Sequence, residues 1–207
     1  MKRVLAALLL SVFLAPALSA ETLEVRPAGP LNLQEALEQA QEGDEVLLGE
    51  GIYKSDTAWS INGKTGLVLK GQGEVWLICR DAGSQVLSIE GSESITVQEV
   101  KLRHEEPLEE GGCEGSVIAV RESRAVRILN CELSGCGSVG VDLEASEELE
   151  ISGCLIHHNS YQAVLLNECT QIVISYNTIV DNQSFLAAYG VDGLEIYGNL
   201  IAYNSQE

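Results

Sequence analysis

The amino-acid sequence predicts an all-β protein, a parallel β-helix built as a single solenoid and preceded by a short capping α-helix. Three observations predict this fold. A pattern of apolar and polar residues recurs at intervals of 23, 23 and 22 residues along the second half of the chain. Within each copy, apolar and polar residues alternate, which is the period of a strand with one buried face. A segment with helical spacing precedes the first of these strands.

The repeat has four kinds of position. Each copy begins with an apolar-polar-apolar triplet and continues with Cys or Asn, then an aliphatic residue, then Cys or Asn again. The triplets begin at Val126, Leu149, Ile172 and Leu194. The later positions are Cys131, Cys154, Asn177 and Asn199, then Leu133, Ile156, Ile179 and Ile201, and finally Cys136, Asn159, Asn182 and Asn204. Agreement at this many positions indicates copies of one structural unit.

Strands this short need partners from neighbouring repeats. A strand of three to five residues pairs in parallel with its equivalent one repeat later, about 4.8 Å along the axis. Equivalent side chains then stack, so inward aliphatic residues form one continuous column and asparagines at the turns form ladders. A ladder lets each side-chain amide bond to the next, which satisfies polar groups that the turn buries.

This pattern of aliphatic residues and turn asparagines resembles the right-handed parallel β-helix repeat of the pectate-lyase-like superfamily, from about Val46 to Asn204. The resemblance implies the fold but no single activity, because lyases, hydrolases, epimerases, adhesins and non-catalytic modules share this scaffold. The chain is similar to domains described as carbohydrate-binding and sugar-hydrolysing β-helices, which also occur in periplasmic copper-maturation proteins.

The N-terminal part contains a helix-start signature. Asn32 is followed three residues later by Glu35, as in a capping box, and Gly43 is expected to end the helix. One helical face carries Leu33, Ala36, Leu37 and Ala40. The segment that follows is similar to the first coil of the superfamily, with strands expected at Glu45–Leu48 and Gly51–Tyr53. We therefore expect a cap over residues 21–45 and a β-helix over residues 46–207 that is incomplete at its C-terminal end.

Residues 1–20 have the order of a secretory signal. Lys2 and Arg3 precede an apolar run from Val4 to Leu14, and small residues follow. The run is too short to span a bilayer, and no later segment reaches the roughly 20 apolar residues that a spanning helix needs. The sequence therefore predicts a secreted or periplasmic protein without a transmembrane segment.

The chain is strongly acidic. Without Lys2 and Arg3 it has 10 basic and 31 acidic residues, a formal charge of −21. Nucleic acid and anionic membranes are poor partners for such a charge. A polyanionic glycan would be repelled as well unless a divalent cation such as Ca²⁺ bridged the carboxylates. Neutral glycans, cations and basic proteins stay open as partners.

One coil carries an insertion, and the repeat places several titratable residues beside it. Ile95 stands 31 residues before Val126, so about eight residues are inserted between Leu102 and Cys113. Counting by the repeat brings to one corner of the coil Arg103, His104, His157, His158 and Asp181. Such a cluster is a candidate site for binding a divalent metal or for proton transfer during sugar cleavage. The alternative is a solvated turn.

Carboxylates offer only weak candidates for calcium, and no other cofactor is predicted. The groups are Glu105, Glu106, Glu109 and Glu110 in the insertion, and Asp142 with Glu144 on a strand. Neither group has the spacing of a dedicated calcium loop. The outward columns of one set of strands also lack the stacked acids that a hydrolase needs. These columns are Ala119, Asp142, Leu165 and Ala188, and Arg121, Glu144, Asn167 and Gly190.

The cysteines follow the repeat. Cys113 and Cys136 share one column, as do Cys131 and Cys154, each pair being 23 residues apart. Neighbouring coils bring such pairs within the distance that a disulfide allows. We expect Cys113–Cys136 to form a disulfide that fastens the end of the insertion, with buried free thiols as the alternative.

Three functions are compatible with the sequence. The first is an exported module that binds a polysaccharide or oligosaccharide. The second is a polysaccharide lyase or glycoside hydrolase that acts at the corner defined by His104, His157, His158 and Asp181. The third is a structural or adhesive stalk, with end-to-end contacts at the uncapped C-terminal coil.

Overall fold

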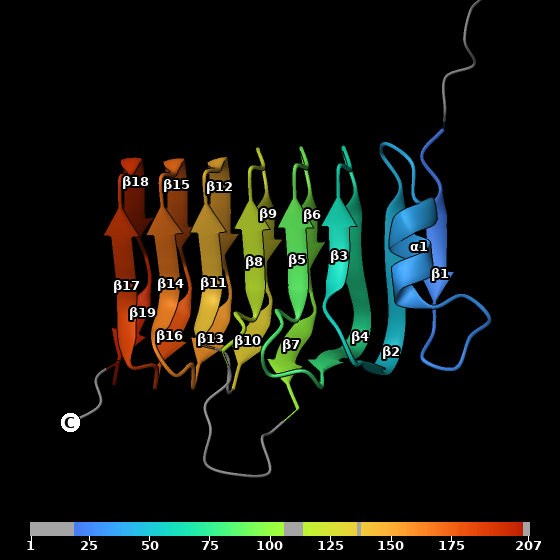
Figure 1. Cartoon of the computed structure of the whole chain (residues 1–207), viewed down its shortest axis with the longest axis horizontal. Coiled ribbons are helices and arrows are strands. Elements are labelled where there is room, and N and C mark those ends of the chain that lie inside the picture. Colours follow the sequence, from blue (N-terminus) through green and yellow to red (C-terminus); the bar gives the residue numbers. More distant parts are fainter. Residues whose placement is uncertain (1–18, 106–113, 136–137, 205–207) are drawn as a thin grey trace, which may run out of the picture.

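The computed structural model describes residues 19–105, 114–135 and 138–204. It is a parallel β-solenoid of about seven turns. The strands stack along the long axis of the molecule, with the helix α1 at the N-terminal end (Figure 1). Every strand pairing within it is parallel.

Each regular coil contributes one strand to each of three faces. The first face consists of β6 (Thr96–Gln98), β9 (Arg127–Leu129), β12 (Glu147–Ser152), β15 (Thr170–Ser175) and β18 (Asp192–Tyr197). The second face consists of β7 (Lys101–His104), β10 (Glu132–Ser134), β13 (Leu155–His157), β16 (Thr178–Val180) and β19 (Leu200–Ala202). The third face consists of β3 (Trp59–Asn62), β5 (Leu87–Glu90), β8 (Ile118–Arg121), β11 (Val139–Glu144), β14 (Gln162–Asn167) and β17 (Ser184–Tyr189).

The N-terminal coils are less regular. β2 (Glu45–Ser55) and β4 (Val68–Cys79) are long strands that run through both the first and the second face. They therefore join these two faces into one 13-stranded sheet, whereas the third face is a separate six-stranded sheet. The two short strands expected within residues 45–53 are one continuous strand.

The stacking of equivalent residues is confirmed. Ile128 pairs with Ile151, which pairs with Ile174 and then with Ile196. Val97 lies opposite Ile128, which confirms the 31-residue coil. These inward positions belong to one continuous core, and each fully buried aliphatic side chain stabilises the fold by roughly 1.5–3 kcal/mol.

The register of the last coil on the third face differs from expectation. Leu165 pairs with Ala187 and Asn167 with Tyr189, so the expected partners Ala188 and Gly190 are each wrong by one residue. Asn182 still stacks on Asn159, so the coil is shortened in the turn before β17. The shorter turn moves the exposed ring of Tyr189 into the outward column.

The N-terminal cap forms largely as expected. α1 spans Leu33–Gln39, and the Asn32 side chain accepts a hydrogen bond of 2.9 Å from the backbone N–H of Glu35. The expected apolar face of the helix is buried. However, α1 ends at Gln39 instead of continuing to Gly43, because Ala40 already has an extended backbone. The segment before the helix also forms a strand, β1 (Thr22–Val25), which pairs with β2.

Polar ladders run along the turns. The amide of Asn159 donates to Asn182 Oδ1 at 2.9 Å, and that of Asn182 donates to Asn204 Oδ1 at 2.8 Å. A second ladder joins Asn177 to Asn199 at 3.0 Å. In earlier coils the column of Asn177 holds the thiols of Cys131 and Cys154, and a separate turn column holds the hydroxyl groups of Ser92, Ser123 and Ser146.

The two ends of the solenoid differ. α1 packs over the N-terminal coils, but the last described coil leaves apolar side chains in solvent, including Ile196, Leu200 and Ile201, which are 40%, 60% and 42% exposed. The described residues also contain no helix long and apolar enough to cross a membrane. End-to-end contact at the C-terminal coil stays a prediction.

Candidate functional site

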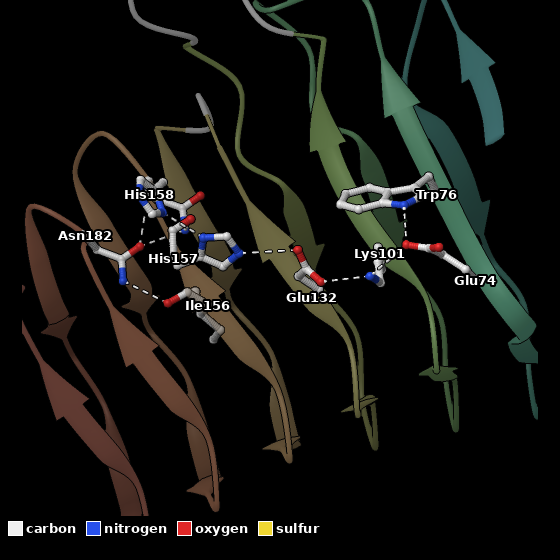
Figure 2. A network of polar contacts seen from close by, with 9 residues as sticks. Glu74, Trp76, Lys101, Glu132, Ile156, His157, His158 and Asn182 are labelled. Atoms are coloured by element: carbon white, nitrogen blue, oxygen red, sulfur yellow. Dashed lines mark hydrogen bonds and ion pairs between the residues drawn. The ribbon is translucent and has the colours of Figure 1, made fainter. Parts of the chain in front are cut away.

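The second face carries a row of interacting polar and aromatic side chains on its outer surface (Figure 2). Trp76 of β4 pairs with Lys101 of β7, which pairs with Glu132 of β10. Their neighbours Leu77, Leu102 and Leu133 are fully buried. Strand alternation therefore points the first three side chains outward and their neighbours into the core.

Two cations lie over the indole of Trp76. Lys101 Nζ is 4.9 Å from the ring centre, and the guanidinium carbon of Arg103 is 5.3 Å from it. The indole Nε1 donates to Glu74 Oε1 at 3.2 Å. Each cation–π contact at an exposed site contributes about 0.5–1 kcal/mol, so these contacts help to hold the ring in place.

Lys101 joins carboxylates from two other coils. Its Nζ lies 3.1 Å from Glu74 Oε1 and 3.3 Å from Glu132 Oε2. The hydrogen bond from Lys101 lowers the pKa of Glu74, and the same bond raises the pKa of Lys101. Both groups are therefore held in their charged forms.

A pair of histidines continues the row. His157 Nε2 lies 3.4 Å from Glu132 Oε1, and its Nδ1 lies 2.7 Å from His158 Nδ1. Burial lowers the pKa of His157 and outweighs the opposing effect of Glu132. A contact between two ring nitrogens requires one of them to donate a proton and the other to accept it, so at least one imidazole is neutral, which agrees with the lowered pKa of His157.

A groove of about 360 Å³ lies beside this row, on the turn between the first and second faces. Its lining includes Gly73, Glu99, Lys101, Asn130, Glu132 and Gly153. Together, the groove, the indole, paired charges and imidazoles provide both an apolar ring and hydrogen-bonding groups for a ligand.

Comparison with protein families identifies the scaffold. Residues 55–206 match the model described as the right handed beta helix region. The chain belongs to the right-handed β-helix family. A search of curated protein sequences found no significant match.

Solved structures share this β-helix fold. An alginate lyase from Paenibacillus sp. str. FPU-7 is 14% identical with a TM-score of 0.63, over 86% of this chain and 75% of that one. A pectin methylesterase mutant in complex with a hexasaccharide is 13% identical with a TM-score of 0.59, over 81% of this chain and 56% of that one. Pectate lyase Pel9A is 13% identical with a TM-score of 0.52, over 88% of this chain and 58% of that one. At these identities the likeness concerns the fold, which this right-handed β-helix shares with carbohydrate-active enzymes.

The β-helix brings together part of the corner predicted from the sequence. His157 and His158 are in contact, and the backbone N–H of His158 donates to the carbonyl of Asp181 on the next coil. Arg103 lies on the same face but at the Trp76 end of the row.

His104 is separated from the other histidines. It follows Arg103 on β7, so strand alternation turns it into the core, where it is 1% exposed. Its Nε2 lies 2.7 Å from the carbonyl oxygen of Ser84, and burial lowers its pKa. Counting by the repeat gave its place along the chain correctly but not the direction of its side chain.

The described carboxylates of the predicted calcium groups lie in ion pairs. Glu105 pairs with Lys54 and Arg80, and the hydrogen bond from Lys54 lowers its pKa. On the third face, Asp142 and Glu144 both pair with Arg121. No group of three His, Cys, Asp or Glu side chains suited to a metal occurs among the described residues. Glu106, Glu109 and Glu110 lie outside them.

The predicted disulfide Cys113–Cys136 also lies outside the described residues. The second cysteine column is present, with the backbone N–H of Cys131 3.5 Å from Cys154 Sγ. Both residues are buried free thiols, and burial raises the pKa of Cys131. These two cysteines thus continue the ladder of turn asparagines into earlier coils.

Sequence reasoning missed Glu74, Trp76, Lys101 and Glu132. The available signal was the alternation in β4 and β7, where Trp76 and Lys101 occupy the polar positions between buried aliphatic residues. The coil from Trp76 to Lys101 is 25 residues long, which a search for a 23-residue period passes over.

Proposed function

We propose that this right-handed β-helix protein is an exported module that binds a polysaccharide on its second face. The observation that carries the proposal is the indole of Trp76, which lies on the outer surface among Lys101, Arg103 and Glu74. A fixed aromatic ring packs against the apolar face of a sugar, while surrounding charged and polar groups bond to its hydroxyls. The signal-like segment at residues 1–20 supports export.

Electrostatics favour binding over glycoside hydrolysis. Glu74 and Glu132 both contact Lys101 Nζ, and a retaining hydrolase also uses two nearby carboxyl groups. However, the general acid of such an enzyme needs a raised pKa, and Lys101 lowers the pKa of Glu74. A carboxylate pair bridged by a lysine suits a binding surface better than proton donation.

A lyase is the second candidate. His157 supports it, because burial lowers its pKa and a neutral imidazole can accept a proton near neutral pH. Turnover of a glycan that is lost in His157→Gln, with binding retained, would favour this candidate over a binding module.

The experiment that tests the proposal is a binding screen with the exported protein against a panel of polysaccharides. We expect binding to at least one glycan, with a change in tryptophan fluorescence, because Trp76 is on the surface whereas Trp59 is only 5% exposed. Trp76→Ala should abolish both signals. Arg124→Ala, which removes ion pairs with Glu147 and Glu148 away from this face, is the matched control and should bind normally.

Two results would overturn the proposal. One is the absence of binding to every glycan in the panel by protein whose circular dichroism shows intact β structure. The other is equal binding by wild type and Trp76→Ala, which would place the glycan elsewhere.

A further inference from the structure

We infer that the ligand is a neutral oligosaccharide chain that lies along the solenoid axis, from Trp76 to a second aromatic platform formed by Tyr176 and Tyr197. This inference rests on the proposed function and specifies the class, direction and minimum length of the glycan. It follows from three features: the pairing of charges on the second face, the floor of the groove, and the exposed tyrosine pair.

The charges around the Trp76 end compensate one another. Lys101 contacts Glu74 and Glu132. In the adjoining turn, Arg80 contacts Asp56 and Glu105. Lys54 also contacts Glu105, and that carboxylate interacts electrostatically with Arg103. These contacts join four cations to four carboxylates, so the charges within this network compensate one another.

A polyuronate would need to displace these carboxylates from their cations. It would also approach a chain with a formal charge of −19, which repels polyanions at low ionic strength. A neutral glycan avoids both the displacement of carboxylates and the long-range repulsion, because it is uncharged and its hydroxyl groups can bond to paired charges without separating them. The surface therefore selects an uncharged chain.

The groove beside the network runs along one column of turn residues. Glu99, Asn130, Gly153, Tyr176 and Gly198 occupy equivalent turn positions on successive coils, and all have φ between +52° and +68°. A Cβ atom at Gly153 would lie 2.3 Å from Asn130 Oδ1. The amide of Asn130 thus lies over Gly153 and lines this part of the groove, one coil before Tyr176.

Tyr176 and Tyr197 form the second platform. Their side chains are 66% and 47% exposed, and their rings meet edge to face with centroids 5.5 Å apart. A Cβ atom at Gly198 would lie 2.7 Å from the Tyr176 ring, so the ring rests against glycine backbone. This support fixes the orientation of the ring at little entropic cost on binding.

Around the platform, hydroxyl groups are joined by one carboxylate, Glu195, which occupies the outward position two residues before Tyr197 on β18. The hydroxyl groups of Ser152 and Ser175 lie 3.1 Å apart in the column that continues to Tyr197. On the other side of the turn, Thr178 follows Leu155 in the outward column. Hydroxyl groups beside aromatic rings match a neutral sugar, which has hydroxyls at its edge and C–H groups on its face.

The distance between the platforms sets the length of the ligand. The outward column passes from Trp76 through Lys101, Glu132 and Leu155 to Thr178. Four coil steps of about 4.8 Å correspond to about 19 Å along the axis. A monosaccharide or disaccharide cannot reach both aromatic platforms, so affinity must rise with chain length until both are contacted.

The test is calorimetry of the full chain with two matched series, neutral gluco-, xylo- and manno-oligosaccharides and oligogalacturonates of the same lengths. For the neutral ligand we expect affinity to increase from disaccharide to hexasaccharide. Tyr176→Ala should weaken hexasaccharide binding about tenfold, as for loss of an aromatic anchor, and leave disaccharide binding unchanged. Tyr176→Phe keeps the ring and should retain the affinity.

Tyr161→Ala is the matched control, because this tyrosine is 56% exposed but lies in the turn after His158, away from the groove. If Trp76→Ala loses binding and Tyr176→Ala keeps it at every length, the proposed function stands and the second platform is overturned. If an oligogalacturonate binds more tightly than every neutral ligand, the neutral class is overturned. If no oligosaccharide or polysaccharide binds, the proposed function itself fails.

Discussion

The ammonium group of Lys101 lies over the ring of Trp76, 4.9 Å from its centre, although the two residues are 25 positions apart in sequence. The parallel register places them side by side, and the same register adds Glu132 on the next coil. Contacts at this surface are therefore a direct consequence of how the coils stack.

Removal of Lys101 should change the titration of Glu74. The hydrogen bond from Lys101 is the largest cause of the lowered pKa of Glu74, so Lys101→Met should move that pKa upward. A pKa that is lowered on folding gives stability above the unfolded value of about 4.3, which is lost as pH falls through the folded pKa. Carboxyl carbon shifts in an NMR titration measure the change.

Lys70→Met is the control for this titration, because Lys70 pairs with Glu99 on the first face at 3.9 Å. It should leave the Glu74 curve unchanged. An unaltered Glu74 curve in Lys101→Met would show that the ion pair on the second face does not form in solution.

The buried His104 should make the fold sensitive to acid. Burial lowers its pKa, so the unfolded chain binds more protons than the folded chain between the folded pKa and about 6.5. Stability is fully present above pH 6.5 and is lost as pH falls toward the folded pKa. His104→Gln should reduce the difference in Tm between pH 7.5 and pH 5.

His157→Gln provides the comparison, because burial also lowers the pKa of His157, but His157 is only half-buried on the outer surface. It should remove a smaller part of the acid loss of stability than His104→Gln. If His104→Gln keeps the full loss of stability in acid, another group causes that loss.

The sequence predicts most of the fold because a regular coil repeats its burial. Ile128, Ile151 and Ile174 are inward residues at fixed spacing, and the structure pairs them. The capping helix could also be predicted from the sequence, because Asn32 and Glu35 form a local helix-start signal that depends on few distant residues. The strand β1 could not be predicted in this way, because its pairing with β2 is a long-range contact made by a short segment.

The site was less predictable because it lies where the coils are irregular. Spacing on the second face is 25 residues from Trp76 to Lys101 and 31 from Lys101 to Glu132, so a constant period misaligns them. A column count also does not say whether a residue just outside the regular repeat points inward. His104 and His158 share a column, but His104 is the inward last residue of β7, whereas His158 follows β13 with a φ of 55° and is exposed.

Within one column of stacked isoleucines, replacement by alanine should lower the free energy of unfolding more at a buried position than at an exposed one. Ile156, Ile179 and Ile201 are stacked, but Ile156 is fully buried and Ile201 is 42% exposed. Ile156→Ala should lower the free energy of unfolding by about 2–5 kcal/mol, as for large-to-small core changes. Ile201→Ala should cost less than about 1.5 kcal/mol, because much of its side chain already contacts water. Urea denaturation of both variants measures the difference.

Equal losses in the free energy of unfolding for Ile156→Ala and Ile201→Ala would mean that Ile201 is covered in solution, for example by a second molecule. Sedimentation of wild type at the concentration used for denaturation distinguishes this case. A monomer with equal costs would contradict the exposed last coil.

The asparagine ladder should be essential where it is buried. The backbone N–H of Cys154 donates to Asn177 Oδ1 at 2.8 Å, and Asn177 Nδ2 donates to the carbonyl of Ile151 at 2.9 Å and to Asn199 Oδ1 at 3.0 Å. Asn177→Ala leaves a buried N–H and a buried C=O without these partners, at about 1–3 kcal/mol for each group. We expect a loss of about 2–5 kcal/mol in the free energy of unfolding. Asn204→Ala, at the edge of the last coil, removes a ladder residue that is only partly buried and should cost less. If the two variants are equally stable, the ladder does not contribute to the fold in proportion to its burial.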